Sequence, residues 1–335
     1  MKHWAESRLV FAAIAQLQQQ GIAAALATVV RVHGSAYRHE GAKLLVGADG
    51  TIVGNVSGGC LEQDVREVAR RVLATGQAER RQYCSGSDEI AAWDLGVGCE
   101  GTVELLVAPV RDAYSAERVA IAQQRPFAVE VPMDGPSDDR RIREGVATPG
   151  LVTDGEGREW FVDAFLPPPQ LLVCGAGDDA MPLARLAVAT GFRVVVTDRR
   201  PGLLTSERFG DDVALRLAQP RDVAVECAAG VDTFAVVMTH HYADDSSYLA
   251  ALRTTTIPYI GMLGPRQRTE RMLAAAEGIE PGDDRRIHAP AGLDIGTDGA
   301  EQVALSIIAE IMAVQAGRPA RPLRERRVPI HAVDG

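Results

Sequence analysis

The sequence has no long apolar run and few aromatic side chains. Of its 335 residues, 46% are hydrophobic, 24% charged and 5% aromatic, which is typical of an ordinary globular protein. No stretch approaches the roughly 20 consecutive apolar residues that cross a bilayer, so we expect no membrane span. The N-terminus also lacks the short apolar core and small-residue cleavage site of a secretion signal. These absences predict a cytoplasmic protein.

Cysteine pairing patterns are absent as well. The five cysteines are an odd number, lie far apart and include no C-x-x-C pair: Cys60, Cys84, Cys99, Cys174 and Cys227. This spacing argues against a disulfide framework and against a zinc ribbon. We therefore predict no resident metal site and expect any functional cysteine to act as a free thiol.

A surplus of basic residues is also missing. The formal net charge of −10 would repel a phosphate backbone, so nucleic acid is not an expected partner. The one basic stretch, residues 318–327, contains prolines and lies near the C-terminus. We expect a solvated, mobile tail over residues 318–335, with the binding of an acidic protein as the alternative.

The length and one proline run predict two domains. A domain averages roughly 150 residues, and Pro167-Pro168-Pro169 favours a stiff extended segment that cannot continue a helix. We expect an N-terminal domain over residues 1–110, an elaboration or bridge over 111–166, and a C-terminal domain over 167–317.

The N-terminal domain is predicted to be mixed α/β. Apolar residues at helical spacing predict a helix over 5–20 that ends at Gly21, and a second helix that follows Cys60 and ends at Gly76. Asp49-Gly50 indicates a hairpin turn between two strands. The expected strands lie at 23–32, 43–46, 51–56 and 102–107. In the bridge we expect a helix at 116–124, a strand at 127–131 and a polar loop at 134–143.

The C-terminal domain alternates apolar strands with helices. The expected strands lie at 171–174, 192–197, 213–217, 234–238 and 257–260, and the expected helices at 180–190, 220–228, 245–253, 266–277 and 301–315. Apolar strands separated by helices indicate a parallel sheet covered on both faces. We predict a Rossmann-like, doubly wound α/β fold.

A glycine-rich turn opens this second domain. Gly175-Ala176-Gly177-Asp178-Asp179-Ala180 matches G-x-G-x-x-A, and Asp198 follows about 20 residues later, where a ribose-binding acid is expected. Gly175, Gly177 and Asp198 are therefore candidate nucleotide-binding residues. The two acids at the helix start favour capping of its N–H groups over phosphate binding. Whether the domain binds a nucleotide stays open at this point.

Cysteine turns mark the first domain. Val56-Ser57-Gly58-Gly59-Cys60-Leu61-Glu62 places a thiol between a strand and a helix, where the helix dipole can lower a cysteine pKa. Cys60 is predicted to be the reactive thiol. Gly96-Val97-Gly98-Cys99-Glu100-Gly101 repeats the arrangement, although the carboxylate of Glu100 opposes a thiolate at Cys99. Cys84, Cys174 and Cys227 are assigned no role.

These motifs, in this order, resemble the XdhC/CoxI family of molybdenum-hydroxylase maturation factors. In the first domain the resemblance rests on Gly34-Ser35-Ala36-Tyr37-Arg38, Gly41-Ala42-Lys43, Asp49-Gly50, the Cys60 motif, and Trp93 ahead of Cys99. In the second it rests on Thr239-His240, Asp245, Gly261-Met262-Leu263-Gly264, Pro290-Ala291-Gly292-Leu293-Asp294-Ile295-Gly296 and Ala309-Glu310-Ile311. This chain departs from the family pattern at Glu100, Pro265 and Asp298-Gly299.

The resemblance implies a cofactor-maturation chaperone rather than a catalyst. Such a protein binds molybdenum cofactor, supports its sulfuration with a cysteine desulfurase, and delivers it to an apo-molybdenum hydroxylase. Cys60 is then the key thiol within its Ser57, Gly58, Gly59 and Glu62 motif, and Arg38 and Lys43 are candidate countercharges for the anionic cofactor. We also expect a homo-oligomer.

Two other functions compete with this interpretation. An NAD(P)-dependent oxidoreductase would use Asp198 to hold its cofactor and His240, just after a predicted strand, as acid or base. A redox-sensing or interaction protein would bind a partner and carry no cofactor. Cofactor content and a screen for hydride transfer separate the three.

Overall fold

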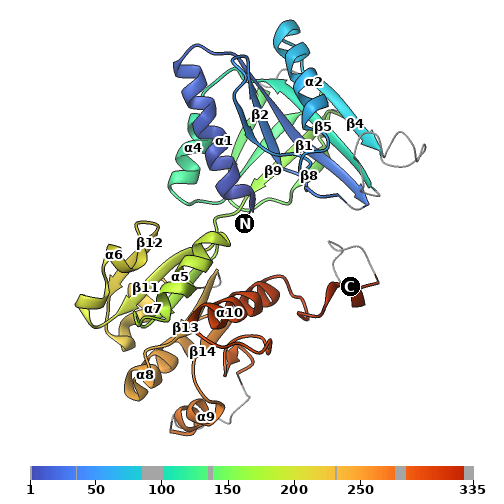
Figure 1. Ribbon diagram of the computed structural model, residues 1–335. Helices are drawn as coiled ribbons and strands as arrows, with labels where there is room; N and C mark the ends of the chain where they lie inside the picture. The colour runs from blue at the N-terminus through green and yellow to red at the C-terminus, as the bar shows by residue number, and fades with distance from the viewer. Residues whose placement is uncertain are drawn as a thin grey trace. The chain divides into compact units, whose positions relative to one another are not determined.

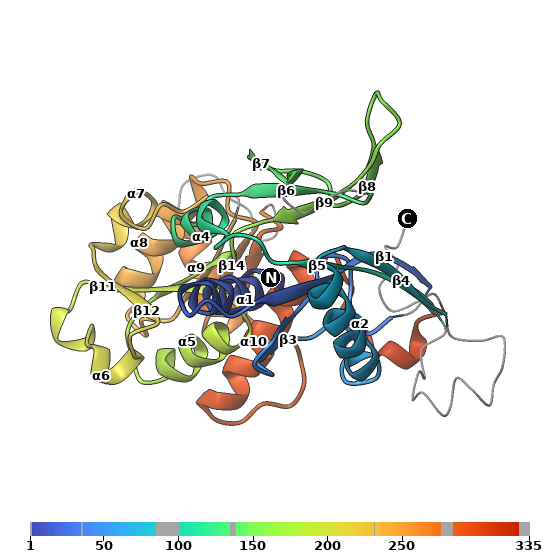
Figure 2. The ribbon, with the colours of Figure 1, turned by 90° about the horizontal axis from the view of Figure 1, so that it is seen from above.

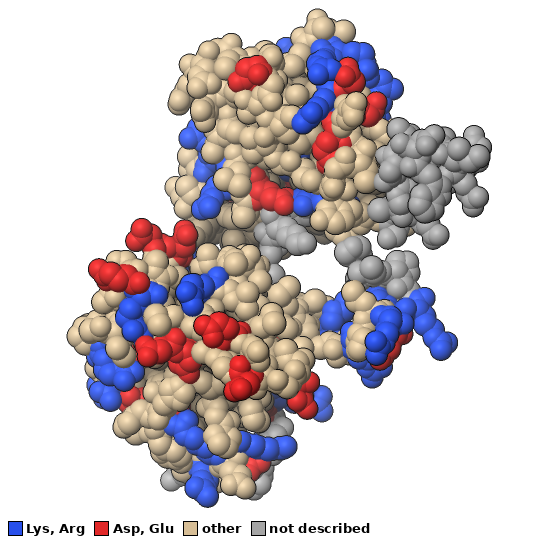
Figure 3. Space-filling model, in the orientation of Figure 1, with Lys and Arg blue, Asp and Glu red and all other residues tan. Residues whose placement is uncertain are grey.

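A computed structural model describes residues 2–34, 36–84, 101–134, 139–230, 232–275 and 284–327 (Figure 1). The contacts divide the chain into two units, Met1–Pro167 together with Arg326–Gly335, and Pro168–Glu325. The first boundary falls within the proline run. None of the described helices is long and apolar enough to cross a membrane. On the face drawn in Figure 3, acidic and basic side chains are interspersed on the surface of each unit.

A five-stranded antiparallel sheet forms the centre of the first unit. Its order is β3-β2-β1-β5-β4, with β1 at Ala24–Gly34, β2 at Lys43–Gly47, β3 at Ile52–Gly54, β4 at Glu79–Cys84 and β5 at Gly101–Pro109. The predicted hairpin is confirmed, because Leu45 of β2 pairs with Val53 of β3 and Gly50 between them has a φ of 92°. Glycine tolerates this left-handed backbone without a steric penalty.

Helices cover both faces of this sheet (Figure 1). The helices among the described residues of this unit are α1 at Lys2–Gln19, α2 at Glu62–Thr75 and α4 at Ser115–Ala122. Alternate residues of β1 face opposite ways: Ala25 and Ala27 pack with α2, whereas Leu26 packs with α1 and α4. Gly76 ends α2 in a left-handed conformation, as predicted.

The middle region contributes a second sheet to the first unit. The order β7-β6-β9-β8 uses β6 at Phe127–Pro132, β7 at Arg141–Glu144, β8 at Gly150–Thr153 and β9 at Glu159–Phe165, and Figure 2 shows these strands as a separate layer. The expected polar loop over 134–143 is wrong in its last part, because β7 begins at Arg141. All four residues of β7 are exposed and three of them are charged, so the strand has no apolar alternation to reveal it.

A six-stranded parallel sheet forms the second unit and confirms the predicted doubly wound fold. Its order is β12-β11-β10-β13-β14-β15, with β10 at Gln170–Cys174, β11 at Arg193–Asp198, β12 at Val213–Leu217, β13 at Thr233–Val237, β14 at Tyr259–Met262 and β15 at Ile287–His288. The last strand has only two residues, too few to leave a pattern in the sequence.

Helices lie on both faces of the parallel sheet. They are α5 at Ala180–Ala189, α6 at Ser206–Phe209, α7 at Val223–Glu226, α8 at Tyr242–Arg253, α9 at Arg266–Ala275 and α10 at Ala300–Gln315, with short 3₁₀ turns at Pro201–Leu203, Pro220–Asp222 and Leu323–Glu325. Leu171 and Val173 of β10 pack with α5 and α10, while Leu172 and Cys174 pack with α8 and α9. The strand order reverses beside β10, and ligands of such folds bind where the loops after β10 and β13 diverge.

Candidate functional site

The turn before α2 presents an exposed thiol. Gly58 and Gly59 have φ values of 88° and 120°, in the left-handed region, and Cys60 follows them with its thiol free and exposed. The helix begins two residues later, at Glu62. The structure thus places Cys60 at a strand-to-helix turn on the surface of the first unit, as predicted.

The carboxylate of Glu62 fills the interior of this turn. Its oxygens accept the backbone N–H of Ser57 and of Gly59, both at 2.9 Å, and the hydroxyl of Ser57. Burial alone would raise the pKa of Glu62, but these hydrogen bonds outweigh it and hold the pKa below its usual range. The N–H of Gly58 is bonded to Asn55 at 2.8 Å. The predicted backbone cradle is therefore satisfied within the chain, and the thiol is the group left facing outward.

A pocket lies beside the Cys60 thiol. It is lined by Tyr37, Arg38, Ser57, Cys60 and Tyr83, among others. The guanidinium of Arg38 pairs with both carboxylate oxygens of Glu6 in α1, one at 2.9 Å from Nη1. This contact holds the guanidinium at the pocket but pairs its charge with a carboxylate of the chain, so the countercharge role of Arg38 stays a prediction.

Lys43, the other predicted countercharge, does not lie at this pocket. Its ammonium is buried, 2.5 Å from the carboxylate of Asp163 and 2.8 Å from the carbonyl of Gly41, and lies 4.9 Å from the centre of the Phe165 ring. Alternate residues of β2 point to opposite faces of the sheet, so Lys43 lies on the same face as Leu45. The α2 helix covers the other face, with Leu44 and Val46. The Lys43 side chain neutralises an internal carboxylate.

Two of the other cysteines have side chains that the structure describes, and both belong to the second unit. Cys99, with Trp93 and Glu100, lies outside the described residues, so the predicted second thiol has no structural account here. Cys174 and Cys227 are buried in the second unit, and burial raises the pKa of both thiols. Cys84 ends β4.

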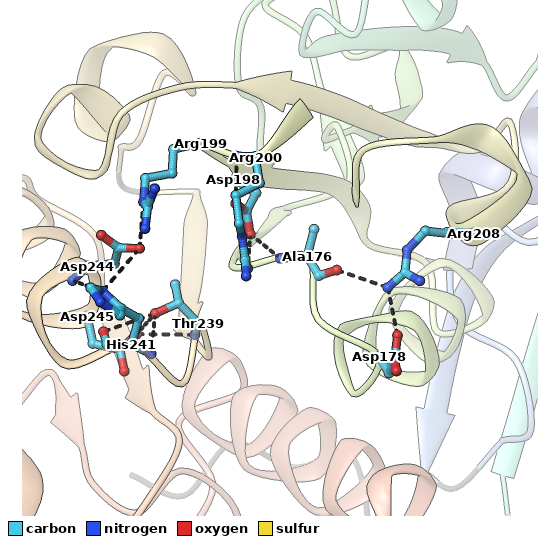
Figure 4. Close-up of polar contacts among 10 residues, drawn as sticks. All are labelled: Ala176, Asp178, Asp198, Arg199, Arg200, Arg208, Thr239, His241, Asp244 and Asp245. Carbon is cyan, nitrogen blue, oxygen red and sulfur yellow. Dashed lines mark hydrogen bonds and ion pairs between the residues drawn. The ribbon is translucent and has the colours of Figure 1, made fainter. Parts of the chain in front are cut away.

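The glycine turn of the second unit is also closed by a carboxylate of the chain. A Cβ on Gly175 (φ 114°) would lie 2.9 Å from the backbone of Met238, so only glycine fits between the two loops. Asp198, buried at the end of β11, accepts the N–H of Ala176 at 2.9 Å and two guanidinium bonds from Arg200, at 2.9 and 2.8 Å (Figure 4). Burial opposes these bonds, yet they lower the pKa of Asp198. The predicted ribose acid is committed to its own chain.

The acids that follow the glycines do not cap α5, contrary to our expectation. Asp179 stands at the N-cap with a helical φ and ψ of −71° and −20° and makes no capping bond, because a capping side chain needs an extended backbone. Asp178 pairs instead with Arg208 at 2.9 Å, and the same Nη2 donates to the carbonyl of Ala176 at 3.0 Å (Figure 4). Gly177 accepts the N–H of Ala180 at 3.2 Å.

Asp179 bonds across the switch point to His240. The His240 Nε2 lies 2.7 Å from Asp179 Oδ2, and His240 has a left-handed φ of 61°. The two residues line a cleft of about 480 Å³ together with Arg185 and Glu301. A carboxylate that orients an imidazole suits proton transfer. The left-handed backbone of His240, however, is also what a tight turn requires, so the contact has a structural explanation as well.

A buried acid, Asp245, shapes the loop that carries His240. Asp245 accepts the N–H of Thr239 at 3.1 Å and its hydroxyl at 2.5 Å (Figure 4). It also pairs with Arg268 at 2.5 Å. His241 then caps α8 through the N–H of Asp244, at 3.4 Å. Sequence reasoning noted Asp245 as a motif residue but missed Arg268 and Arg208, because nothing local marks an arginine that reaches another loop.

The half-buried carboxylate of Glu310 holds the loop after β15. Glu310 of α10 accepts the hydroxyl of Tyr259 at 2.6 Å and the N–H of Gly292 at 2.8 Å, and it lies 3.1 Å from His288. Burial opposes these contacts, yet they lower the pKa of Glu310. The Ala309-Glu310-Ile311 and Pro290–Gly296 motifs are thereby joined into one structural unit.

The fold and the two turns define a two-domain α/β protein with a C-terminal Rossmann domain. Family models match in both domains: the XdhC Rossmann domain over residues 171–311, and the XdhC and CoxI family over residues 17–84. A Bacillus subtilis protein, named as a probable subunit of xanthine dehydrogenase, is 33% identical over 314 residues, which is 86% of this chain and 92% of that relative. The chain belongs to the XdhC/CoxI family.

Two further relatives support this assignment. The molybdenum cofactor insertion chaperone PaoD of Escherichia coli is 26% identical over 88% of this chain and 84% of its own. A crystal structure from Bacillus halodurans, described as a xanthine dehydrogenase, superposes with a TM-score of 0.76 at 29% identity. The match covers 94% of this chain and 98% of that one.

Proposed function

We propose that this chain is an accessory protein that carries molybdenum cofactor to a molybdenum hydroxylase of the xanthine dehydrogenase type. The observation that carries the proposal is the exposed Cys60 thiol, set on a glycine turn in one pocket with Arg38. The cofactor is an anionic pterin with sulfur ligands and a phosphate. A thiol and a guanidinium suit such cargo, because one offers a soft nucleophilic sulfur and the other has N–H donors beyond the two that bind Glu6.

In this proposal the cofactor is cargo that the chain holds until it is delivered. Cys60 contacts it, Arg38 balances its negative charge, and the Glu62-filled turn keeps the thiol pointing outward. A cysteine desulfurase supplies the sulfur that the cofactor needs, and an apo-hydroxylase receives the finished cofactor. The name of the Escherichia coli relative, a molybdenum cofactor insertion chaperone, supports this role.

The Rossmann unit gives less support to the oxidoreductase alternative. A dehydrogenase would need the carboxylate of Asp198 for a ribose, but both of its oxygens are bonded to Ala176 and Arg200. His240 Nε2 is likewise bonded to Asp179. We therefore place the chemistry of the protein at Cys60.

A transfer experiment tests the proposal. The purified chain is loaded anaerobically with cofactor, desalted, analysed for molybdenum and pterin, and mixed with an apo-hydroxylase. We expect Cys60→Ser to keep the fold, since the side chain is exposed, and to abolish activation of the client. Cys227→Ala, which removes a buried thiol of the other unit, serves as the control and should activate normally. Normal activation by Cys60→Ser would overturn the carrier mechanism.

A further inference from the structure

Tyr37 is a large aromatic residue left in solvent beside the reactive thiol. Its side chain is 69% exposed, and it lines the same pocket as Cys60 and Arg38. Single exposed aromatic residues are common on protein surfaces and need no explanation by themselves. Tyr37 differs from such residues because its position is tied to the cysteine turn.

The backbone of Gly58 fixes one side of the Tyr37 ring. A Cβ built on Gly58 would lie 2.7 Å from Cδ1 and 2.8 Å from Cε1 of Tyr37, so the ring packs directly against the glycine. Gly58 also has a φ of 88°, so two separate requirements select glycine at this position. The ring is therefore positioned by the turn that presents the thiol, while most of its surface stays open to a ligand.

The other tyrosine of the pocket is committed elsewhere. The hydroxyl of Tyr83 donates to Asp64 at 2.5 Å, and burial together with this neighbouring carboxylate raises the pKa of the Tyr83 phenol. Tyr83 is thus held in the wall of the pocket by its bond to Asp64. Tyr37 is the tyrosine of this pocket that offers an exposed aromatic surface for stacking next to the thiol.

We infer that Tyr37 is the stacking surface on which the planar pyrimidine ring of the cargo's pterin rests, with its sulfur-bearing part toward Cys60 and its anionic part toward Arg38. Aromatic rings stack favourably on planar heterocycles, and the three groups at this pocket match the three chemical parts of the cargo. Tyr37 is in this view a positioning residue that sets the affinity for the pterin. The inference rests on the proposed function, since it concerns the same cargo.

Binding measurements with three variants test the inference. The probes are molybdenum cofactor released anaerobically from a hydroxylase, and pterin-6-carboxylate as a ring without dithiolene or molybdenum. Tyr37→Leu removes the aromatic surface but retains an apolar side chain against Gly58, and Tyr37→Phe retains the ring. Tyr242→Leu, at a tyrosine that is 45% exposed in the other unit, is the matched control.

Stacking predicts a pattern that a merely structural role would not produce. We expect Tyr37→Leu to weaken cofactor binding about tenfold and to lose the quenching of pterin-6-carboxylate fluorescence, whereas Tyr37→Phe and Tyr242→Leu bind both probes like the parent chain. Unfolding temperatures of all variants identify any loss of fold. Because Tyr37→Phe keeps the ring and removes only the hydroxyl, its affinity shows whether the ring is the group that contacts the pterin.

The outcomes separate this inference from the proposed function. If the parent chain and Tyr37→Leu bind cofactor equally, the stacking role is overturned and the carrier function stands. If Tyr37→Phe binds as weakly as Tyr37→Leu, the hydroxyl rather than the ring is the contact, and the inference again fails. If the parent chain binds no cofactor, the proposed function itself fails, and the stacking role fails with it.

Discussion

The turn before α2 and the turn after β10 share a construction but differ in what they leave open. Each combines a left-handed glycine with a carboxylate that accepts backbone N–H groups, Glu62 in the first and Asp198 in the second. In the first turn the carboxylate supports an exposed thiol. In the second, arginines cover the turn: Arg200 binds Asp198 and Arg208 bridges Ala176 to Asp178. A glycine-rich turn therefore marks a backbone shape, and the neighbouring side chains decide whether it can bind a ligand.

Thiol reactivity should show the largest difference between the two units. We expect Cys60 to react with a limiting alkylating agent at least about a hundredfold faster than Cys174 or Cys227, because buried thiols react only after local opening. Mass spectrometry of peptides after short exposure measures this ratio. Comparable rates for Cys60 and Cys174 would show that the thiol at the turn is shielded.

Alanine at the two glycines should destabilise the units to different extents. Gly175→Ala places a methyl group against the backbone of Met238 and should cost about 3 kcal/mol, whereas Gly58→Ala meets a movable ring and should cost about 1–2 kcal/mol. Denaturant unfolding measures both. Gly202→Ala and Gly155→Ala are matched controls, since a Cβ at either position meets open space and neither φ is left-handed. A larger loss of unfolding free energy in Gly58→Ala than in Gly175→Ala would contradict this prediction.

Neutralising the two carboxylates should separate the turns further. Asp198→Asn should cost about 2–3 kcal/mol because it breaks buried bonds to a charged arginine, while Glu62→Gln, nearer to solvent, should cost about 1 kcal/mol. Both folded-state pKa values are lowered, so each carboxylate stabilises the fold above its unfolded pKa, near 3.8 for Asp198 and 4.5 for Glu62. This stability is lost as the pH falls through the folded values. Unfolding measured from pH 6 to pH 3 should therefore show a shallower loss in each variant than in the parent chain.

Dinucleotide binding tests directly whether the second turn accepts a ligand. We expect weak binding of NAD(H) or NADP(H) by the parent chain, and a gain of a few kcal/mol at most in Asp178→Asn/Asp179→Asn, which removes two negative charges near the start of α5. Titration calorimetry decides between the forms. Micromolar binding by the parent chain, with turnover of a small alcohol or carbonyl compound, would instead favour the dehydrogenase interpretation.

Much of the fold follows from local patterns. Apolar runs between helices determined the parallel sheet, because strands covered on both faces need apolar residues at every position. The exposed strand at Arg141–Glu144 escaped the same reasoning, since a strand without a buried face has no alternating pattern. The order of the motifs likewise identified the family, as no single glycine turn would have done.

The sequence by itself determined where the turns lie and which residue types stand at them, whereas the tertiary structure decided which groups remain available. Lys43 and Asp163 are 120 positions apart, and Ala176 and Arg208 are 32 apart, so no local pattern indicates that they bind each other. The contact of Tyr37 with Gly58 joins two different loops in the same way. A buried charge must find a partner, and that partner is selected by distance in the fold rather than along the chain. For this reason Lys43, Arg38 and Asp198, all plausible ligand contacts from the sequence, lie in internal pairs, whereas the Cys60 thiol is exposed.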